Sequence, residues 1–252
     1  MRITILGNNG SYPGPEGACS GFLVEEGKTN LLVDCGTGVL SNLQKHRDLR
    51  SVSDIVISHI HADHFFDLIP YRYALKYGLR APQTPHPRLY LPPGGVETLA
   101  RVVSPFAESQ SFFADVFAMS EYDPKGRLPL EDVAVSFAAV LHYIPSYAIA
   151  ITGSKKITYS SDSGPCPGLL EIAASADLFL CNIGACLREG DPSLWGHLTP
   201  KQAGTAAREA RAKRLLLTHL WPACDRTLSL KEASQAFGGP VELAELSRTY
   251  DV

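Results

Sequence analysis

Three histidines and an aspartate occupy six consecutive positions in the first quarter of the chain. The segment "ISHIHADHF", residues 57–65, contains His59, His61, Asp63 and His64. Imidazole nitrogens and carboxylate oxygens are the ligands that zinc and other borderline divalent ions take in proteins. The apolar run "DIVIS" leads into the segment, so we expect these side chains to gather where a strand ends and a helix begins. The pattern predicts a metal site.

A catalytic pair of metal ions needs more ligands than one short motif supplies. Three later apolar runs each end in a suitable residue: "VAVSFAAVLH" in His142, "KITYSSD" in Asp162 and "KRLLLTH" in His219. Taken singly, each residue also fits a structural role, such as a buried histidine bonded to a carbonyl or an aspartate capping a turn. Their common position at strand ends favours a single centre shared with the histidine cluster.

The elements that must position these residues are strands and helices in layers. Short apolar or alternating runs that end in Gly, Asp, Ser or His predict many strands. Helices are expected at residues 38–46, 64–77, 96–106, 168–176 and 200–212, and Thr199 and Gln202 form a capping-box pattern at the start of the last. Strand runs outnumber helices, which favours two sheets packed face to face with helices outside. We expect one α/β domain over residues 1–252.

Composition excludes several classes of function. The 252 residues carry 23 Lys and Arg against 26 Asp and Glu, a net charge of -3, so tight binding to a long nucleic acid is not expected. The opening "MRITILG" lacks the features of a signal peptide, and no run approaches the roughly twenty apolar residues of a membrane span. We therefore expect a cytoplasmic protein without membrane contact. The six cysteines form no C-x-x-C pair and are predicted to be reduced thiols.

The H-x-H-x-D-H pattern at residues 59–64, followed by His142, Asp162 and His219, resembles the metallo-β-lactamase superfamily. More narrowly, "LLVDCGTG", "YSSDSGP" and "GHLTPKQAGTAAREARAKRLLLTH" resemble the ribonuclease Z branch of phosphodiesterases. The resemblance implies an αββα four-layer sandwich, the metallo-β-lactamase fold, with two divalent metal ions at the edge of the sheets. Zinc is the expected metal, with Mn²⁺ and Fe²⁺ as alternatives.

The resemblance also implies a role for each residue. One ion would be held by His59, His61 and His142, the other by Asp63, His64 and His219, with Asp162 bridging both. Asp34, at the end of "NLLVD", would accept a hydrogen bond from a ligand imidazole and fix its tautomer. Asp63 would also orient the attacking hydroxide, and His197 would stabilise or protonate the departing alkoxide. Apart from the resemblance, Ser146 and Tyr147 in "PSY" and the backbone of residues 7–10 are either donors to phosphate oxygens or plain turn residues.

The chain departs from full-length ribonuclease Z enzymes in one large feature. Those enzymes carry a long Gly- and Pro-rich arm for transfer RNA between the equivalents of His142 and Asp162, whereas only nineteen residues lie between them here. Asn182 stands where relatives commonly place a glutamate, which weighs against an acid role at that position. The chain therefore resembles a short form without the arm, and we do not predict transfer-RNA processing as its main activity.

The function predicted on this basis is metal-dependent hydrolysis of a small or flexible phosphodiester, such as a cyclic nucleotide or an RNA end, by a metal-bridging hydroxide. Alternatives are hydrolysis of a thioester, lactone or lactam, a residual tRNA 3′-processing endonuclease, or a non-catalytic nucleotide-binding module. Expected partners are small-molecule or short nucleic-acid diesters. A second subunit could cover the open cleft, so a homodimer is also expected.

Overall fold

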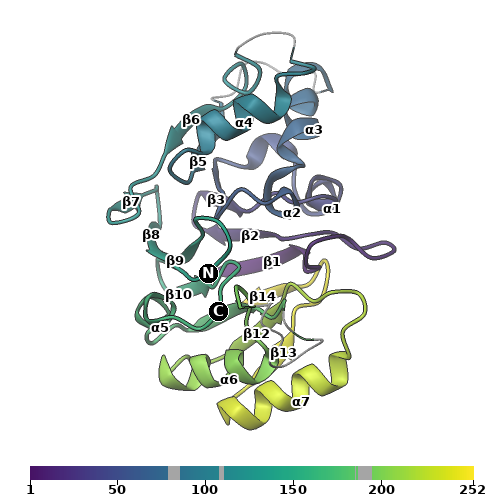
Figure 1. Ribbon diagram of the computed structural model, residues 1–252. Coiled ribbons are helices and arrows are strands. Elements are labelled where there is room, and N and C mark those ends of the chain that lie inside the picture. The colour runs from purple at the N-terminus through teal and green to yellow at the C-terminus, as the bar shows by residue number, and fades with distance from the viewer. Residues whose placement is uncertain (79–85, 108–110, 185, 187–194) are drawn as a thin grey trace.

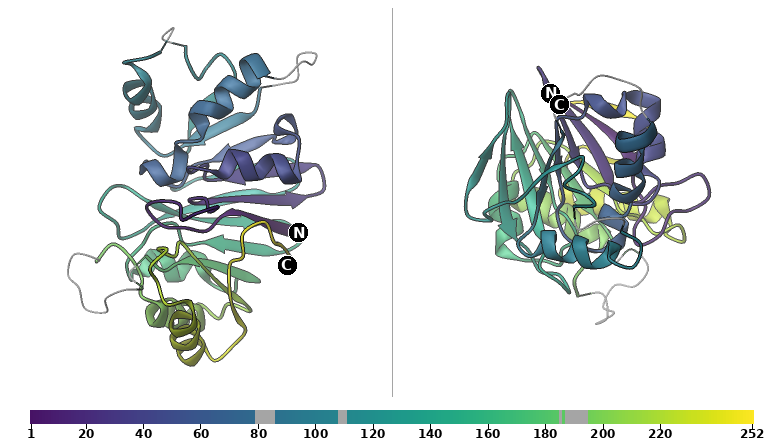
Figure 2. Two further views of the ribbon diagram at one scale, coloured as in Figure 1. Left: turned by 90° about the vertical axis from the view of Figure 1, so that its right-hand side faces the viewer. Right: turned by 90° about the horizontal axis from the view of Figure 1, so that it is seen from above.

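A computed structural model describes residues 1–78, 86–107, 111–184, 186 and 195–252. The described residues form two seven-stranded sheets that pack face to face. The first sheet has the order β14-β1-β2-β3-β4-β5-β6 and the second the order β13-β12-β11-β10-β9-β8-β7. Figures 1 and 2 show α1–α4 gathered over the first sheet and α5–α7 over the second. This is the four-layer metallo-β-lactamase fold, and the predicted fold class is confirmed.

The strands of the first sheet are β1 (Arg2–Gly7), β2 (Gly21–Glu26), β3 (Thr29–Val33), β4 (Asp54–Val56), β5 (Arg88–Leu91), β6 (Ala118–Glu121) and β14 (Thr249–Asp251). Those of the second are β7 (Arg127–Pro129), β8 (Ala134–Ala139), β9 (Tyr147–Thr152), β10 (Lys156–Tyr159), β11 (Leu178–Asn182), β12 (Leu215–Thr218) and β13 (Val241–Leu243). The last strand, β14, returns to pair antiparallel with β1, so the two ends of the chain lie side by side (Figure 1).

The helices are α1 (Val39–His46), α2 (Ala62–Phe65), α3 (Leu68–Tyr73), α4 (Gly95–Val103), α5 (Pro167–Ala173), α6 (Pro200–Glu209) and α7 (Arg226–Phe237), with a 3₁₀ turn η1 (Leu49–Ser51) and a π-helical turn η2 (Ala74–Gly78). The capping box of α6 is confirmed, because the Gln202 backbone N–H donates to the Thr199 hydroxyl and the Thr199 N–H donates to the Gln202 side chain. Among the described helices, none is both long and apolar enough to cross a bilayer.

Apolar side chains fill three layers of core. The central layer lies between the sheets and takes β-branched, leucine and aromatic residues from both, such as Phe22 and Val33 from one and Ile157 and Leu216 from the other. One outer layer packs α1, α3 and α4 on the first sheet, and the other packs α5, α6 and α7 on the second. Burial of both faces explains why many strands read as continuous apolar runs.

Two helical predictions need correction. Residues 64–77 were expected to form one helix, but they form α2, α3 and a π-helical turn. Pro70 has no N–H to donate, so it fits the first turn of a new helix rather than the interior of a long one. Helix α7 was not predicted. Its buried residues are the widely spaced Ser229, Ala233 and Phe237, a stripe too small and polar to give a clear hydrophobic period.

The prediction for the cysteines was wrong for one pair. Cys186 and Cys224 form a disulfide across 38 residues of sequence, whereas Cys19, Cys35, Cys166 and Cys181 are free. The two bonded residues follow β11 and β12, which are parallel neighbours. The carboxyl ends of parallel neighbours lie together, so residues distant in sequence meet there. Sequence spacing alone gave no sign of this proximity.

Candidate metal centre

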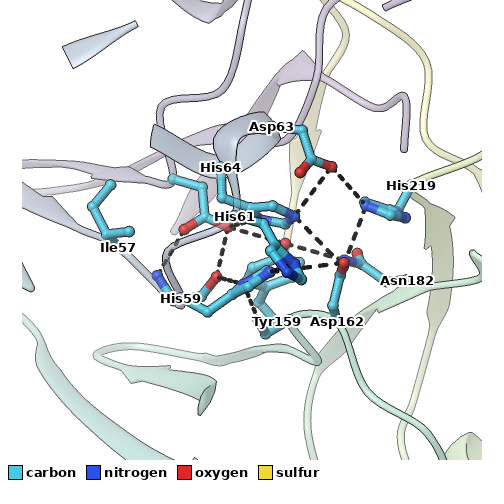
Figure 3. Close-up of polar contacts among 12 residues, drawn as sticks. Ile57, His59, His61, Asp63, His64, Tyr159, Asp162, Asn182 and His219 are labelled. Carbon is cyan, nitrogen blue, oxygen red and sulfur yellow. Dashed lines mark hydrogen bonds and ion pairs between the residues drawn. The ribbon is translucent and has the colours of Figure 1, made fainter. Parts of the chain in front are cut away.

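The residues predicted to bind metal come from both sheets and meet at one edge of the sandwich (Figure 3). His59 and His61 follow β4, and Asp63 and His64 lie in α2, the short helix that comes next. The second sheet contributes His142 after β8, Asp162 after β10 and His219 directly after β12. Potential ligand atoms lie within 4.8 Å of one another in each of three overlapping groups, namely His59, His61, His142 and Asp162; Asp63, His64 and His219; and Asp162, His197 and His219.

The first group is a set of three imidazoles. The Nδ1 atom of His61 lies 3.2 Å from Nε2 of His59 and 3.0 Å from Nε2 of His142. Nδ1 of His142 lies 2.8 Å from the carbonyl oxygen of Gly196. A carbonyl only accepts, so the His142 hydrogen is on Nδ1 and its Nε2 presents a lone pair to the cluster. This is the tautomer that binds a metal ion through Nε2.

The second group joins a carboxylate and two imidazoles. Oδ2 of Asp63 lies 3.3 Å from Nε2 of His219 and 3.6 Å from Nε2 of His64. Nδ1 of His64 donates to Oδ2 of Asp34 at 2.7 Å, so Nε2 of His64 also presents a lone pair. That Nε2 atom is buried and has no hydrogen-bond partner in the described part of the chain.

Asp162 lies between the two groups, with one carboxylate oxygen toward each. Its Oδ2 atom is 3.8 Å from Nε2 of both His59 and His142. Its Oδ1 atom is 3.6 Å from Nε2 of His64 and 3.3 Å from Nε2 of His219. Ligand atoms about 2.1 Å from a tetrahedral ion stand about 3.4 Å apart, close to these separations. The arrangement therefore fits a carboxylate that joins two cations.

The donor set fits divalent cations on chemical grounds as well. The Nε2 atoms of His64 and His142 face carboxylate oxygens and another imidazole nitrogen, and this concentration of acceptors is what a cation would satisfy. His59, His64 and Asp162 are at most 2% exposed, so solvent does little to compensate. A cation at each group would satisfy these acceptors at once.

The pKa shifts of the buried groups also favour the binding of cations. Burial lowers the pKa of His59, His61 and His142, so these imidazoles are neutral at neutral pH, the form that binds metal. Burial opposes ionisation of Asp162, but His219 and His64 outweigh it and hold the Asp162 pKa well below its usual range. Burial likewise opposes protonation of His64, yet Asp162, Asp34 and Asp63 raise its pKa. The same three carboxylates would equally stabilise a cation bound at Nε2 of the neutral imidazole.

Asp34 lies behind His64, as expected. It is fully buried, and its carboxylate accepts hydrogen bonds from Nδ1 of His64, the Ser58 N–H (2.8 Å), the Ser58 hydroxyl (2.9 Å) and the Tyr159 hydroxyl (3.1 Å). A carboxylate held by this many donors fixes the His64 tautomer.

Four further residues belong to this layer and were not predicted: Ser58, Tyr159, Ser161 and Asn182. The hydroxyls of Ser58 and Ser161 lie 3.1 and 3.3 Å from Nδ1 of His59. The Asn182 amide donates to Oδ1 of Asp162 at 2.5 Å and to the Tyr159 hydroxyl at 3.2 Å. Their adjacency to strand ends was the available signal, but Ser and Asn are so common in turns that it carried little weight.

His197 precedes α6 and reaches the centre from the side. Its Nδ1 atom lies 3.9 Å from Oδ2 of Asp162, and its ring stacks on that of His219 with 5.7 Å between centroids. Nδ1 is buried, and no described residue forms a hydrogen bond with it. Burial lowers the pKa of His197 to about 4, so its imidazole is neutral at neutral pH.

Ser146 and Tyr147 do not point into the cluster. The Ser146 hydroxyl is buried, donates to the backbone oxygen of Asp162 at 3.0 Å and contacts the Ser161 hydroxyl at 2.9 Å. Tyr147 packs on Tyr122 at the edge of the core between the sheets. This placement suits support of the Asp162 turn more than contact with substrate.

The predicted phosphate loop at residues 7–10 is also used within the protein. The N–H groups of Asn8 and Asn9 donate to the carbonyl of Ala18, and that of Gly10 donates to the carbonyl of Leu220. They are not available to a phosphate, so the expectation for this backbone was wrong. The loop instead approaches His219 closely, and the N–H of Ser11 donates to Oδ2 of Asp63 at 2.8 Å.

Known proteins share this fold and these sequence features. A family model described as a beta-lactamase superfamily domain matches residues 29–220. YhfI of Bacillus subtilis, named a probable metallo-hydrolase, is 30% identical over 249 residues, covering 97% of each chain. Its crystal structure matches with a TM-score of 0.88 at 27% identity, over 99% of this chain and 98% of that one.

Two ribonuclease Z proteins match over similar lengths. Ribonuclease Z of Myxococcus xanthus is 26% identical over 298 residues, which cover 97% of this chain and 95% of that protein. The crystal structure of the short form of human tRNase Z has a TM-score of 0.74 at 24% identity, over 100% of this chain and 99% of that one, and shows the same fold.

Proposed function

This chain belongs to the beta-lactamase superfamily and is a metal-dependent hydrolase of its ribonuclease Z-like branch, and from this premise we propose that it hydrolyses small or flexible phosphodiesters. The observation that carries the proposal is the position of Asp162, with one oxygen toward each of two groups of imidazole and carboxylate ligands. A pair of divalent ions joined in this way suits in-line displacement at phosphorus.

We assign the ligands as follows. One ion would be held by His59, His61 and His142, the other by Asp63, His64 and His219, with Asp162 shared. Zinc suits a donor set of neutral imidazoles and carboxylates without thiolates, and Mn²⁺ or Fe²⁺ could replace it. Bound there, the ions would supply Lewis acidity and lower the pKa of water.

The chain's own residues would position the reacting groups. Asp63 belongs to the second group of ligands and would also accept a hydrogen bond from the attacking water. His197, on the other side of Asp162, would donate a hydrogen bond to the leaving oxygen. Because burial lowers its pKa, His197 acts as a neutral N–H donor until the negative charge of a substrate favours its protonation.

The charge of the centre favours an anionic substrate over a neutral lactone or thioester. Two divalent ions would bring four positive charges against the three negative charges of Asp34, Asp63 and Asp162, a net charge of about +1 before a hydroxide is counted. Asn182 contributes to this balance, because its neutral amide contacts Asp162 where a glutamate would add a further negative charge. The two cations would stabilise the negative charge of a phosphodiester, whereas a lactone or thioester carries no such charge before attack.

The short connection between His142 and Asp162 supports a small substrate. Residues 143–161 contain a turn, β9 and β10, which pair as an antiparallel hairpin within the second sheet. Every residue of this segment is described, and none extends as an arm. We propose that the protein acts in the cytoplasm as a homodimer on cyclic nucleotides or short RNA ends rather than on folded transfer RNA.

Hydrolysis of bis(p-nitrophenyl) phosphate tests the proposal. Protein loaded with zinc or manganese should release p-nitrophenol, and His142→Ala should lose the activity together with one equivalent of bound metal. His86→Ala, at an exposed histidine outside the centre, is the matched control and should retain both. Fully loaded protein that cleaves lactones or thioesters but no phosphodiester would refute the proposal in favour of carbonyl chemistry.

A further inference from the structure

Two large aromatic side chains are exposed immediately beside the candidate metal centre. Tyr143 is 42% exposed and Trp195 is 47% exposed. Their rings meet edge to face, with centroids 4.9 Å apart and planes at 73°. The Tyr143 ring also lies 4.9 Å from the ring of His142 and 5.7 Å from that of His197. We call Tyr143 and Trp195 together the aromatic ledge.

Contacts with the centre fix the ledge in place. The carbonyl of Gly196, the residue after Trp195, accepts the hydrogen bond from Nδ1 of His142. A Cβ atom at Gly196 would lie 3.0 Å from the Tyr143 ring, and one at Gly164 would lie 2.1 Å from the backbone oxygen of Trp195. Gly164 therefore allows a backbone approach that a Cβ atom would block, and it holds the backbone of Trp195 against the centre.

The geometry of the ledge selects a flat ring. Because the two planes are nearly perpendicular, a planar ligand stacked on one ring presents its edge to the other. Stacked and edge-to-face arrangements are the two geometries that aromatic rings prefer. A flexible acyl chain would gain no such directional contact. The neighbouring centre favours an anion, so the ligand that fits both features is a planar base joined to a phosphate ester.

We infer that the aromatic ledge of Tyr143 and Trp195 is a base-stacking subsite, and that the substrate is a nucleotide diester whose base lies on the ledge while its phosphate lies at the metal centre. This inference rests on the proposed function and adds the site that would hold the base of its substrate. Stacking of a base on an aromatic side chain does not select among bases, so we expect purine and pyrimidine nucleotides both to bind.

The test compares ligands that differ only in the base. Adenosine 5′-monophosphate and ribose 5-phosphate carry the same phosphate, and the base should improve binding to the zinc-loaded protein about 5- to 150-fold. Calorimetry measures both affinities without catalysis. Trp195→Ala and Tyr143→Ala should each bring the ratio of the two affinities toward one by weakening the binding of adenosine 5′-monophosphate alone. Trp195→Phe should retain most of the ratio. Phe106→Ala removes an aromatic ring of similar exposure outside the site and should not change the ratio.

A second readout places the base on Trp195 itself. The chain has two tryptophans, so Trp221→Phe leaves Trp195 as the single tryptophan, which can be excited selectively at wavelengths where tyrosine does not absorb. Adenosine 5′-monophosphate should quench its emission, and ribose 5-phosphate should not. Equal affinity of the two ligands for the wild-type protein would overturn the inference, and so would an equal loss of affinity for both ligands in Trp195→Ala. Dissociation of a dimer by Trp195→Ala would also overturn it, because the ledge would then be a subunit interface.

The outcomes separate this inference from the proposed function. Hydrolysis of bis(p-nitrophenyl) phosphate without any advantage from a base would refute the subsite and leave the phosphodiesterase activity intact. Base-dependent binding by a fully loaded protein that cleaves no diester would support the subsite and refute the activity.

Discussion

Replacement of Asp34 by asparagine tests how the buried layer behind the ligands controls metal binding. Asp34 has a left-handed backbone with φ of 56°, a conformation that asparagine tolerates, so Asp34→Asn changes the side-chain chemistry with little backbone strain. Three of the four donors to Asp34, from His64, Ser58 and Tyr159, point at Oδ2, and the Ser58 N–H points at Oδ1. One of these two positions must become an amide N–H₂ group.

Either orientation of the asparagine leaves a conflict. With its nitrogen at the Oδ2 position, the amide faces Nδ1–H of His64, and His64 can accept only by moving its hydrogen to Nε2. That movement removes the lone pair that faces Asp63 and Asp162. With its nitrogen at the Oδ1 position, the amide faces the Ser58 N–H, and a buried donor loses its partner at a cost of about 1–3 kcal/mol.

The expected result is a loss of metal affinity at one site. Changes to groups behind metal ligands lower affinity about 10- to 100-fold, which corresponds to about 1.4–2.7 kcal/mol. Competition with a chromophoric chelator should show this loss for the ion held by His64, with a smaller change for the other ion. Tyr159→Phe removes one donor and keeps the ring, so it should fall between wild type and Asp34→Asn. Unchanged affinity of both ions in a destabilised Asp34→Asn protein would refute the reasoning and leave Asp34 a purely structural role.

Three further results are expected. Gly10→Ala would place a Cβ atom 2.5 Å from Nδ1 of His219, so it should reduce bound metal by about one equivalent. The control Gly78→Ala, whose Cβ meets nothing within 4 Å, should bind the normal amount of metal. Equal metal content in the two variants would contradict this prediction. Thiol titration of the denatured, unreduced protein should find four thiols, and reduction should add the two of Cys186 and Cys224; six thiols before reduction would contradict the disulfide. In a separate unfolding experiment, reduction should lower the free energy of unfolding by about 3–4 kcal/mol. Chelation should lower the melting temperature, because ions at 100 times their Kd stabilise the fold by about 2.7 kcal/mol; an unchanged melting temperature after verified metal removal would refute this.

The clustering of the candidate metal ligands was the most predictable part of the molecule. His142, Asp162 and His219 each follow an apolar run, and the carboxyl ends of strands in a layered fold lie at a shared edge. Chemistry and spacing together were therefore enough to bring distant residues into one site. The supporting residues carried no such signal, because Ser58 and Asn182 act through hydrogen bonds that only the packed structure defines.

The fold was predictable where burial determines the pattern and less so elsewhere. Two facing sheets leave their inner surfaces apolar, so strands such as β1, β3 and β12 were visible as continuous hydrophobic runs. Strands at sheet edges, such as β7 and β13, are short and half exposed, and helix α7 buries mainly small side chains. These elements form because the adjoining core holds them, and a local sequence pattern does not record that contribution.

The loop at residues 7–10 supports a left-handed backbone conformation next to the centre, which gives it a structural role. Asp34, Ser161 and His219 all have φ between 54° and 58°, and each follows a strand that leads into the site. A left-handed conformation costs a residue with a side chain about 1–2 kcal/mol, so neighbouring contacts must hold it. For His219, those contacts come from the loop, because the N–H of Leu220 donates to Asn8 and its carbonyl accepts from Gly10. The loop thus stabilises a sharp reversal that turns His219 toward Asp63 and Asp162, and metal binding would offset part of the strain.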